Sequence, residues 1–450
     1  MERPQPPKVN PPSHRRRKRA AWHRQADGAE GEQPPPVLEH PMVPQGEPML
    51  VNDAVSLARL VEQLRSAPLV AFDTEFIGEE TYRPRVCLVQ VATAEAVSLV
   101  DPLSLEARGE HASLIALHEA LSSPETLTLV HAGFHDVEAI RLATGREPQR
   151  VVDTQIAAAM VGLPWPASLA TVLESLTGHR PGKAHTFTEW DARPLSTTQL
   201  LYAADDVRYL PLLWHRLAEE LDRRGRLEWA LAESAESLAD APFDPRGQVK
   251  RIARADLVGL VNRAVITALV LERQVIARDH DVPPRAALPD AAVADIARAR
   301  PADAESLRRV KGIPGRTREH CAERLVAAVA HGLATPAEPD GIADAMSRRG
   351  IRAEVDRAWP RLQERCLALG IATELVISRA GFTSWFCREV SARHGRPMKG
   401  PAEPLAESPF RSGSWREQAL GELVRELRDE IGPPPAPPAR APRRRRRSTE

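Results

Sequence analysis

The sequence lacks long apolar runs, paired cysteines and an excess of charge of either sign. No run approaches the ~18 apolar residues that a membrane span needs, which argues against a membrane protein. The Pro- and Arg-rich N-terminus has no apolar core segment, so we expect no secretory signal there. The four cysteines are widely spaced and form no CxxC pair (Cys87, Cys321, Cys366, Cys387). This argues against a disulfide framework or zinc ribbon and predicts a cytoplasmic protein.

The zero net charge at first argues against a nucleic-acid partner, but the charges are unevenly distributed. Residues 1–25 hold eight Lys or Arg and one acid, and residues 431–450 hold six Arg and one acid. The body between them therefore carries a net charge near −12. An acidic body is compatible with an enzyme that binds nucleic acid through metal ions and local basic patches. It would be unusual for binding through a broad cationic face.

At 450 residues the chain is too long for one ordinary core, and its composition divides it into segments. Residues 1–47 and 433–450 are rich in Pro and Arg, and we predict disordered basic tails there. The tails could also act as phosphate-binding arms. Two helical segments, 250–335 and 342–432, are separated by a Pro-, Gly- and Asp-rich link at 334–341.

Residues 48–223 alternate between strand and helix patterns. Strand patterns occur at 49–51, 69–76, 86–92, 96–100, 127–132 and 151–154. This alternation predicts an α/β domain in which helices cover a mixed sheet. The last long helix has a clear start, because Ser196 and Gln199 form a capping-box pattern.

Acidic residues follow a buried strand in the run LVAFDTEF. Asp73 and Glu75 are two residues apart, so on a strand their side chains point to the same face. Adjacent carboxylates beside an apolar run are costly unless a cation joins them. Alone, the pattern also fits an ordinary strand end with solvated acids.

A second acid lies in LVHAGFHDVEAI, where a strand passes through a turn into a helix. Asp136 is in the first turn of that helix, where it could simply compensate the helix dipole. His131 and His135 are four residues apart, but no third ligand with zinc-like spacing accompanies them. We therefore expect polar or solvated roles for both histidines.

The third element is the capped helix. Tyr202 and Asp206 are four residues apart and share a face, whereas Asp205 points elsewhere. An amphipathic helix with a buried Tyr and a polar Asp would give the same pattern. Together, however, a strand D-x-E, a strand–turn–helix Asp and a helical Y-x-x-x-D occur in that order.

This set resembles the DEDD exonucleases, in the branch with a tyrosine in the third motif, and most closely the ribonuclease D family. The resemblance covers 47–222, through DTEF (73–76), TYRPRVCLVQVA (81–92), VDPL (100–103), HAGFHDVEAI (131–140), VVDTQIAAAM (151–160), SLATVLESLTG (168–178), the Lys183–Trp190 stretch and ARPLSTTQLLYAADDVRYL (192–210). It implies a ribonuclease H-like fold and a metal-dependent 3′→5′ exoribonuclease that releases nucleoside 5′-monophosphates. The implied partner is RNA with a free 3′ end, such as a tRNA precursor.

The resemblance also assigns roles to five residues. It implies that Asp73, Glu75, Asp136 and Asp206 are catalytic acids that bind two divalent ions, and that Tyr202 is catalytic. Oxygen-only ligands suit Mg²⁺ or Mn²⁺ better than zinc. Asp73 would bridge both ions, and Tyr202 would orient the attacking water. Nothing in the motifs indicates an inactive enzyme.

Both C-terminal segments resemble parts of the same family. Segment 250–335 resembles an HRDC domain, a small nucleic-acid-binding helical module. Its LRRVKGIPGR turn could present charge and N–H groups to a phosphate through Lys311, Gly312, Gly315 and Arg316. A plain helix–helix turn with a C-cap at Gly312 fits equally well. Segment 342–432 resembles a second, diverged HRDC-like region, in which we expect Trp415 to anchor a core rather than stack on a base.

Two alternatives remain open at this point: a 3′→5′ DNA exonuclease and a non-catalytic nucleic-acid-binding scaffold. The order of an exonuclease domain and two helical segments favours RNA, with tRNA 3′-end maturation or related RNA processing as the role. No residue pattern reads the 2′-hydroxyl directly. Complete motifs disfavour the scaffold. We expect a monomer that binds no membrane.

Overall fold

The computed structural model describes residues 36–78, 80–181, 189–239, 243–255, 260–335, 351–393 and 408–431. Most of the two predicted tails, most of the predicted link at 334–341 and most of the Lys183–Trp190 stretch lie outside these ranges. Residues 36–47, which we assigned to the N-terminal tail, pack on the first domain: Val43 is buried and Arg208 donates to the carbonyl of Pro44. No helix within the described ranges is long and apolar enough to span a bilayer.

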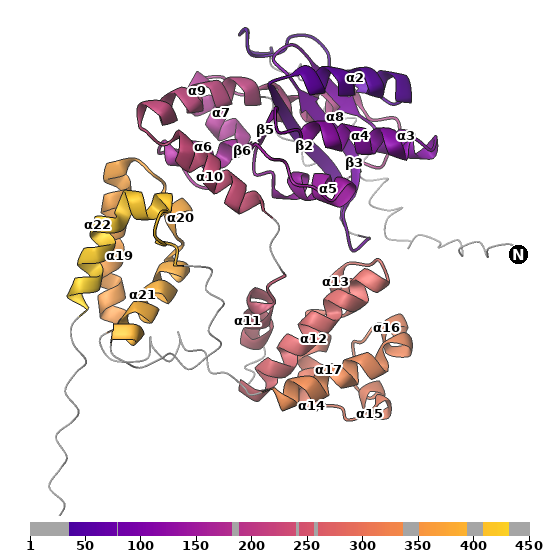
Figure 1. The fold of residues 1–450 in the computed structure, drawn as a ribbon. Coiled ribbons are helices and arrows are strands. Elements are labelled where there is room, and N and C mark those ends of the chain that lie inside the picture. Colours follow the sequence, from indigo (N-terminus) through magenta and orange to yellow (C-terminus); the bar gives the residue numbers. More distant parts are fainter. Residues whose placement is uncertain are drawn as a thin grey trace, which may run out of the picture.

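A six-stranded mixed sheet forms the centre of the first domain (Figure 1). Its strands are β1 (Met49–Val51), β2 (Leu69–Ile77), β3 (Arg85–Ala92), β4 (Val97–Val100), β5 (Leu127–Val130) and β6 (Val151–Asp153), in the order β1-β4-β3-β2-β5-β6. Strands β2, β3 and β4 form an antiparallel meander, while the pairs β1–β4, β2–β5 and β5–β6 are parallel. The predicted mixed α/β sheet is therefore confirmed.

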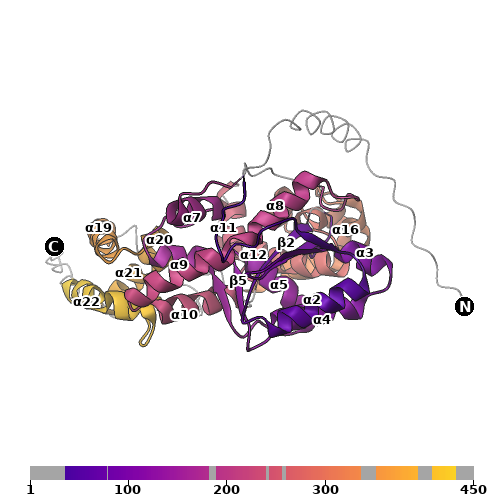
Figure 2. The same ribbon diagram turned by 90° about the horizontal axis from the view of Figure 1, so that it is seen from above.

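Helices cover both faces of this sheet, because its strands alternate apolar residues to either side. Val70 and Phe72 belong to the core beneath α2 (Ala54–Ser66), α3 (Pro102–Ala107), α4 (His111–Leu121) and α5 (Phe134–Thr144). Ala71 belongs to the opposite core, which includes α6 (Thr154–Met160), α7 (Leu169–Thr177), α8 (Thr197–Arg208), α9 (Leu210–Arg223) and α10 (Leu227–Leu238). Figure 2 shows α8 and α9 on one side of β2 and α2 and α4 on the other.

Two helical blocks follow this domain. The first has α11 (Arg246–Ala255), α12 (Leu260–Asp279), α13 (Pro284–Ala287), α14 (Asp290–Ala299), α15 (Ala304–Arg308), α16 (Gly315–His320) and α17 (Ala322–Ala334), and a core of its own. The second has α19 (Ile351–Leu369), α20 (Thr373–Val376), α21 (Arg379–Arg393) and α22 (Trp415–Glu430), and its buried residues are continuous with the core under α6 and α9. Whether this second block is an HRDC-like unit stays a prediction.

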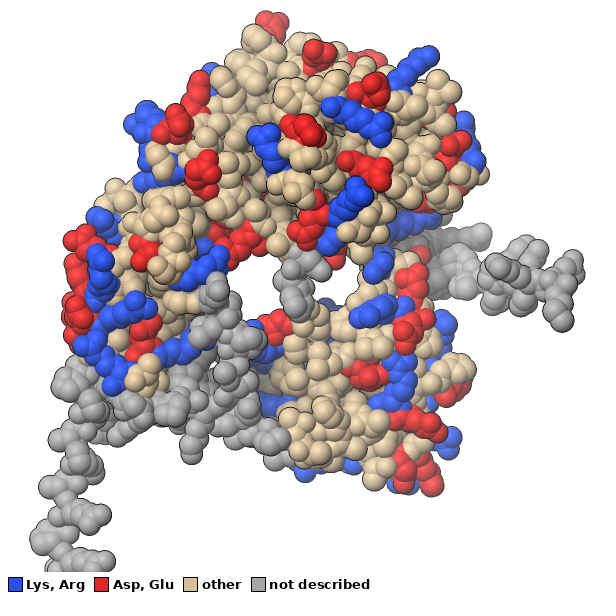
Figure 3. Space-filling model, in the orientation of Figure 1, with Lys and Arg blue, Asp and Glu red and all other residues tan. Residues whose placement is uncertain are grey.

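The space-filling view in Figure 3 shows an opening between the first domain and the two helical blocks. Acidic and basic side chains are interspersed over this face, and neither sign forms a continuous patch. This face of the described residues therefore shows no broad cationic surface.

Candidate active site

Strand β2 positions the first two acids. Its residues Val70, Ala71 and Phe72 are fully buried, which fixes the register of the polar residues that follow. Asp73 and Glu75 share the face of Ala71, toward α8, as the i, i+2 spacing predicted. Both side chains are partly buried.

A tight turn between β5 and α5 positions Asp136. Ala132 has a φ of +56°, and a Cβ on Gly133 would lie 2.3 Å from Cβ of Val130, so only glycine fits there. Asp136 is in the first turn of α5 and is 6% exposed. Its carboxylate accepts a hydrogen bond of 2.5 Å from the Thr74 hydroxyl, which joins α5 to β2.

Helix α8 positions the tyrosine and the last acid. The predicted capping box is present: the Ser196 hydroxyl accepts from the Gln199 N–H, and the Gln199 side chain accepts from the Ser196 N–H. The hydroxyl of Tyr202 hydrogen-bonds to the carboxylate of Asp206, one turn away on the same face. Asp205 points elsewhere, as expected, and forms an ion pair with buried Arg208 at 3.2 Å.

The four acids are close enough to perturb one another. Burial raises the pKa of Asp73 well above its ordinary value, and Asp136, Asp206 and Glu75 raise it further. Burial, followed by the charges of Asp206 and Asp136, raises the pKa of Glu75 to about 8. Burial and the charge of Asp205 raise the pKa of Asp206 to about 7.

The pKa values of Asp136 and Tyr202 are raised as well. Burial raises the pKa of Asp136, and the hydrogen bond from Thr74 partly offsets this rise. Burial and the charge of Asp206 raise the pKa of Tyr202 above its usual 10. The structure therefore brings together all five residues that the sequence selected.

Buried carboxylates that repel one another in this way suit a divalent cation, whose charge would offset the repulsion. The donors are all oxygens, which favours Mg²⁺ or Mn²⁺ over zinc. Among the described residues, no three His, Cys, Asp or Glu side chains are already arranged as around a metal ion. The all-oxygen donor set and the repulsion between the acids therefore fit a divalent ion, although the described side chains are not already arranged around one.

The two histidines near Asp136 do not form a zinc site. His131 lies between the Thr154 hydroxyl at 2.9 Å and the Ala167 carbonyl at 3.0 Å. His135 is on the surface and pairs with Glu138 at 3.2 Å. The polar and solvated roles expected for them are confirmed.

Asp153 supports the site, but the sequence reasoning missed it. Its carboxylate accepts the N–H groups of Ala132 and Gly133, at 3.0 and 3.3 Å, and so holds the turn that carries Asp136. It also caps α6 by accepting from Gln155 N–H. An Asp directly before a helix was the available signal, because Asp is favoured at helix N-caps. An Asp at the end of a strand such as VVDT is equally typical of a solvated strand end, so the signal was weak.

Gln90 was also missed. It lies directly opposite Asp73 in the β2–β3 pair, so the two side chains share a face. Gln90 is fully buried, and neither amide atom has a hydrogen-bond partner among the described residues. A single polar residue within the apolar run VCLVQVA was the signal for it.

The second predicted contact surface lies in the first helical block. Lys311, Gly312, Gly315 and Arg316 are all exposed in and after the turn between α15 and α16. Gly312 has a φ of +79°, but α15 ends with Arg309 as its C-cap, so Gly312 is not a helix cap as the alternative proposed. The turn is open to a ligand, and its role stays a prediction.

Comparison with known proteins identifies the family of this chain. A family model described as 3′–5′ exonuclease matches residues 48–222, and one described as HRDC domain matches residues 262–329. Ribonuclease D of Gluconacetobacter diazotrophicus is 33% identical over 395 residues, which cover 85% of this chain and 93% of that protein. The chain belongs to the ribonuclease D family. Ribonuclease D of Acidiphilium cryptum is 36% identical over 269 residues, 59% of this chain and 67% of that one.

A solved structure supports the same assignment. The crystal structure of Escherichia coli ribonuclease D, described as an exoribonuclease involved in structured RNA processing, is similar with a TM-score of 0.68 at 25% identity. The similarity covers 86% of this chain and 99% of that one. The chain is a hydrolase, a 3′–5′ exoribonuclease of the ribonuclease D type, and its family implies divalent metal ions and an RNA substrate.

Proposed function

We propose that this chain removes nucleoside 5′-monophosphates one at a time from the 3′ end of RNA with two divalent ions, Mg²⁺ or Mn²⁺. The observation that carries the proposal is the cluster of four carboxylates beside the Tyr202 hydroxyl, in which burial raises every pKa and the neighbouring charges raise those of Asp73, Glu75 and Asp206 further. Asp73, Glu75, Asp136 and Asp206 would hold the ions. When bound, the ions supply an activated water and stabilise charge on the leaving 3′ oxygen.

Tyr202 would orient the attacking water. Its raised pKa keeps the hydroxyl protonated near neutral pH, so it can donate or accept a hydrogen bond but is a poor base. Its hydrogen bond to Asp206 fixes the hydroxyl beside the acid cluster. Thr74 would hold the Asp136 carboxylate in place through their 2.5 Å hydrogen bond.

The proposed role is maturation of tRNA 3′ ends or related RNA processing in the cytoplasm. The similarity to an enzyme of structured RNA processing supports this role, as does an HRDC match next to the exonuclease match. We propose that Lys311 and Arg316, with the backbone at Gly312 and Gly315, contact the RNA phosphates. All four are exposed.

One assay tests the activity. The protein is incubated with Mg²⁺ and 5′-labelled RNA or DNA of equal sequence, with and without EDTA. Asp206→Asn should lower the rate by about 10³-fold or more, since a catalytic metal supplies several kcal/mol. The matched control is Asp205→Asn, because Asp205 lies next to it but faces Arg208, and this variant should keep most of its activity.

The outcomes separate the alternatives. Stepwise shortening of RNA from the 3′ end that requires metal and Asp206 supports the proposal. Endonucleolytic fragments, or equal rates in the two variants, would contradict it. Faster shortening of DNA than of RNA would replace the proposed substrate, and RNA binding without hydrolysis would identify a scaffold.

A further inference from the structure

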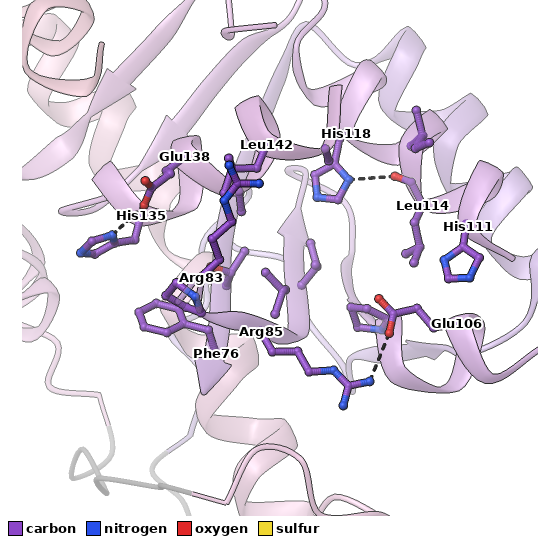
Figure 4. Close-up of a pocket in the computed structure, with 18 residues that line it drawn as sticks. Phe76, Arg83, Arg85, Glu106, His111, Leu114, His118, His135, Glu138 and Leu142 are labelled. Carbon is purple, nitrogen blue, oxygen red and sulfur yellow. Dashed lines mark hydrogen bonds and ion pairs between the residues drawn. The ribbon is translucent and has the colours of Figure 1, made fainter. Parts of the chain in front are cut away.

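A cavity of about 440 Å³ lies on the face of the sheet opposite Asp73 and Glu75. It is formed by the β2–β3 hairpin, α3, α4 and α5 (Figure 4). Alternation along β2 explains its place, since Asp73 and Glu75 face α8 while Thr74 and Phe76 line this cavity. The volume is within the range of small-ligand sites.

The walls of the cavity are apolar although they are open to solvent. Phe76 is 38% exposed, Ile115 43% and Leu142 44%, and all three line the cavity. Exposed aliphatic and aromatic side chains around a concave site are costly in water and favour a flat, partly apolar ligand. A nucleobase has this shape and chemistry.

His118 supplies a polar group in this wall. Its side chain is 8% exposed, and Nδ1 donates to the Leu114 carbonyl at 2.8 Å. Burial lowers the pKa of His118, so the ring is neutral and Nε2 is an acceptor. Nε2 has no partner among the described residues. A buried acceptor without a partner is unfavourable, and an N–H donor of a ligand would satisfy it.

Charged side chains of both signs line the cavity, namely Arg83 and Arg85, and Glu106 and Glu138. Arg83 is exposed and makes no ion pair with any described residue, whereas Arg85 pairs with Glu106 at 3.2 Å. His111 and His135 also line the cavity. Figure 4 shows the Arg83 side chain lying between Phe76 and Leu142. A phosphate at this edge would meet the Arg83 guanidinium, which no described carboxylate pairs with.

We infer that this cavity binds a nucleoside 5′-monophosphate group, with the base against the apolar wall and His118 and the phosphate at Arg83. The group could belong to an unpaired nucleotide within an RNA chain or be a free mononucleotide. All four bases carry an N–H donor for Nε2, so the site would not select one base. Thr74 lines the cavity and also donates to Asp136, so a ligand would contact a residue that touches the acid cluster.

Calorimetric titration of the full-length protein with AMP and CMP tests the free-nucleotide source. EDTA is present throughout, so nucleotide binding through active-site metal ions is suppressed and the outcome is separable from failure of the proposed catalysis. Arg83→Glu should weaken binding about tenfold or more, because it replaces a charge-assisted hydrogen bond with repulsion. Ile115→Trp should block the cavity from an exposed position. The matched control is Arg59→Glu, an equal charge change at an exposed position on α2 outside the cavity.

Photocrosslinking tests the RNA source. RNA that carries 4-thiouridine at single internal positions is irradiated with the protein in EDTA, and the linked peptides are identified by mass spectrometry. Crosslinks to α4 or α5 that disappear in Arg83→Glu and Ile115→Trp, but not in Arg59→Glu, support an unpaired RNA nucleotide. Titration heat with the same variant pattern supports the free nucleotide. If neither experiment depends on Arg83 and Ile115, the inference is wrong.

Discussion

The two helical blocks have similar helical sequence patterns but pack in different ways. The block at 260–335 encloses its own core, and its described contact with the first domain is at the β2–β3 hairpin, where Tyr82 N–H donates to Asp281. The described buried residues of the block at 351–431 form no separate core, since they continue into that of α6 and α9. One block is therefore built as an attached module, and the other as an extension of the catalytic domain.

Buried polar anchors make the second block part of the catalytic domain. Glu233 on α10 is 4% exposed and accepts two hydrogen bonds from Arg416, at 2.6 and 2.7 Å, and one from the Trp415 indole at 2.7 Å. Arg226 donates to the carbonyl of Met160 in the first domain and to that of Leu369 in the second block. Trp415 is thus a core anchor, as expected.

The largest expected effect comes from removing the Glu233 anchor. Glu233→Ala leaves Arg416 buried without its ion-pair partner, so the free energy of unfolding should fall by about 3–5 kcal/mol. Denaturant unfolding measures this loss. Glu236→Ala is the control, because Glu236 pairs with Arg411 on the surface and exposed pairs contribute about 0–1 kcal/mol. Equal losses in the two variants would break the comparison.

A smaller and local effect is expected in the first block. Arg273 is 1% exposed and donates to Asp290 at 2.7 Å and to the Leu288 carbonyl at 3.1 Å. Arg273→Met should destabilise this block by about 1–3 kcal/mol, because a buried carbonyl loses its donor. Hydrogen exchange should quicken in α12–α17 and stay unchanged in the sheet. The control is Arg298→Met, at a surface ion pair, which should change neither the stability nor the hydrogen exchange of the block. Faster exchange in the sheet of Arg273→Met would show that the two cores are coupled.

A smaller difference between the two blocks is expected in their contributions to RNA affinity. The double variant Lys311→Glu with Arg316→Glu should weaken RNA binding several-fold. It should also lower the salt dependence of binding, because the variant makes fewer phosphate contacts and so releases fewer counterions. Filter binding over a salt series measures both quantities. Arg352→Glu with Arg365→Glu makes the same charge change on exposed positions of α19 and should have little effect. A similar loss in both pairs would point to general electrostatics.

The weakest expected effect concerns the hairpin contact. The Arg278 guanidinium lies 5.8 Å from the centre of the Tyr82 ring. Tyr82→Ala should lower the free energy of unfolding by under about 1 kcal/mol, as expected for a partly exposed cation–π contact. It should also let the first helical block take up a wider range of positions relative to the first domain. Small-angle scattering would detect a larger radius of gyration, and Tyr82→Phe should restore it. An unchanged radius would mean that other contacts fix the block.

Local sequence determined much of this protein. The strand alternation of β2 placed Asp73 and Glu75 on one face. The capping box at Ser196 fixed the start of α8, and the i, i+4 spacing placed Tyr202 beside Asp206. These features depend on neighbours within a few residues, so periodicity and capping rules can read them. The family resemblance then predicted that these elements, which are distant in sequence, form one site.

Only the tertiary structure decided the rest. Gln90 opposite Asp73, Asp153 beneath the turn at Gly133, and Glu233 between Arg416 and Trp415 all depend on contacts between distant segments. The same holds for the unpaired Nε2 of His118 in its cavity. A helical or strand period shows which face of an element is buried, but not what covers that face. The sequence therefore predicted both helical blocks, while packing decided which of them shares a core with the active-site domain.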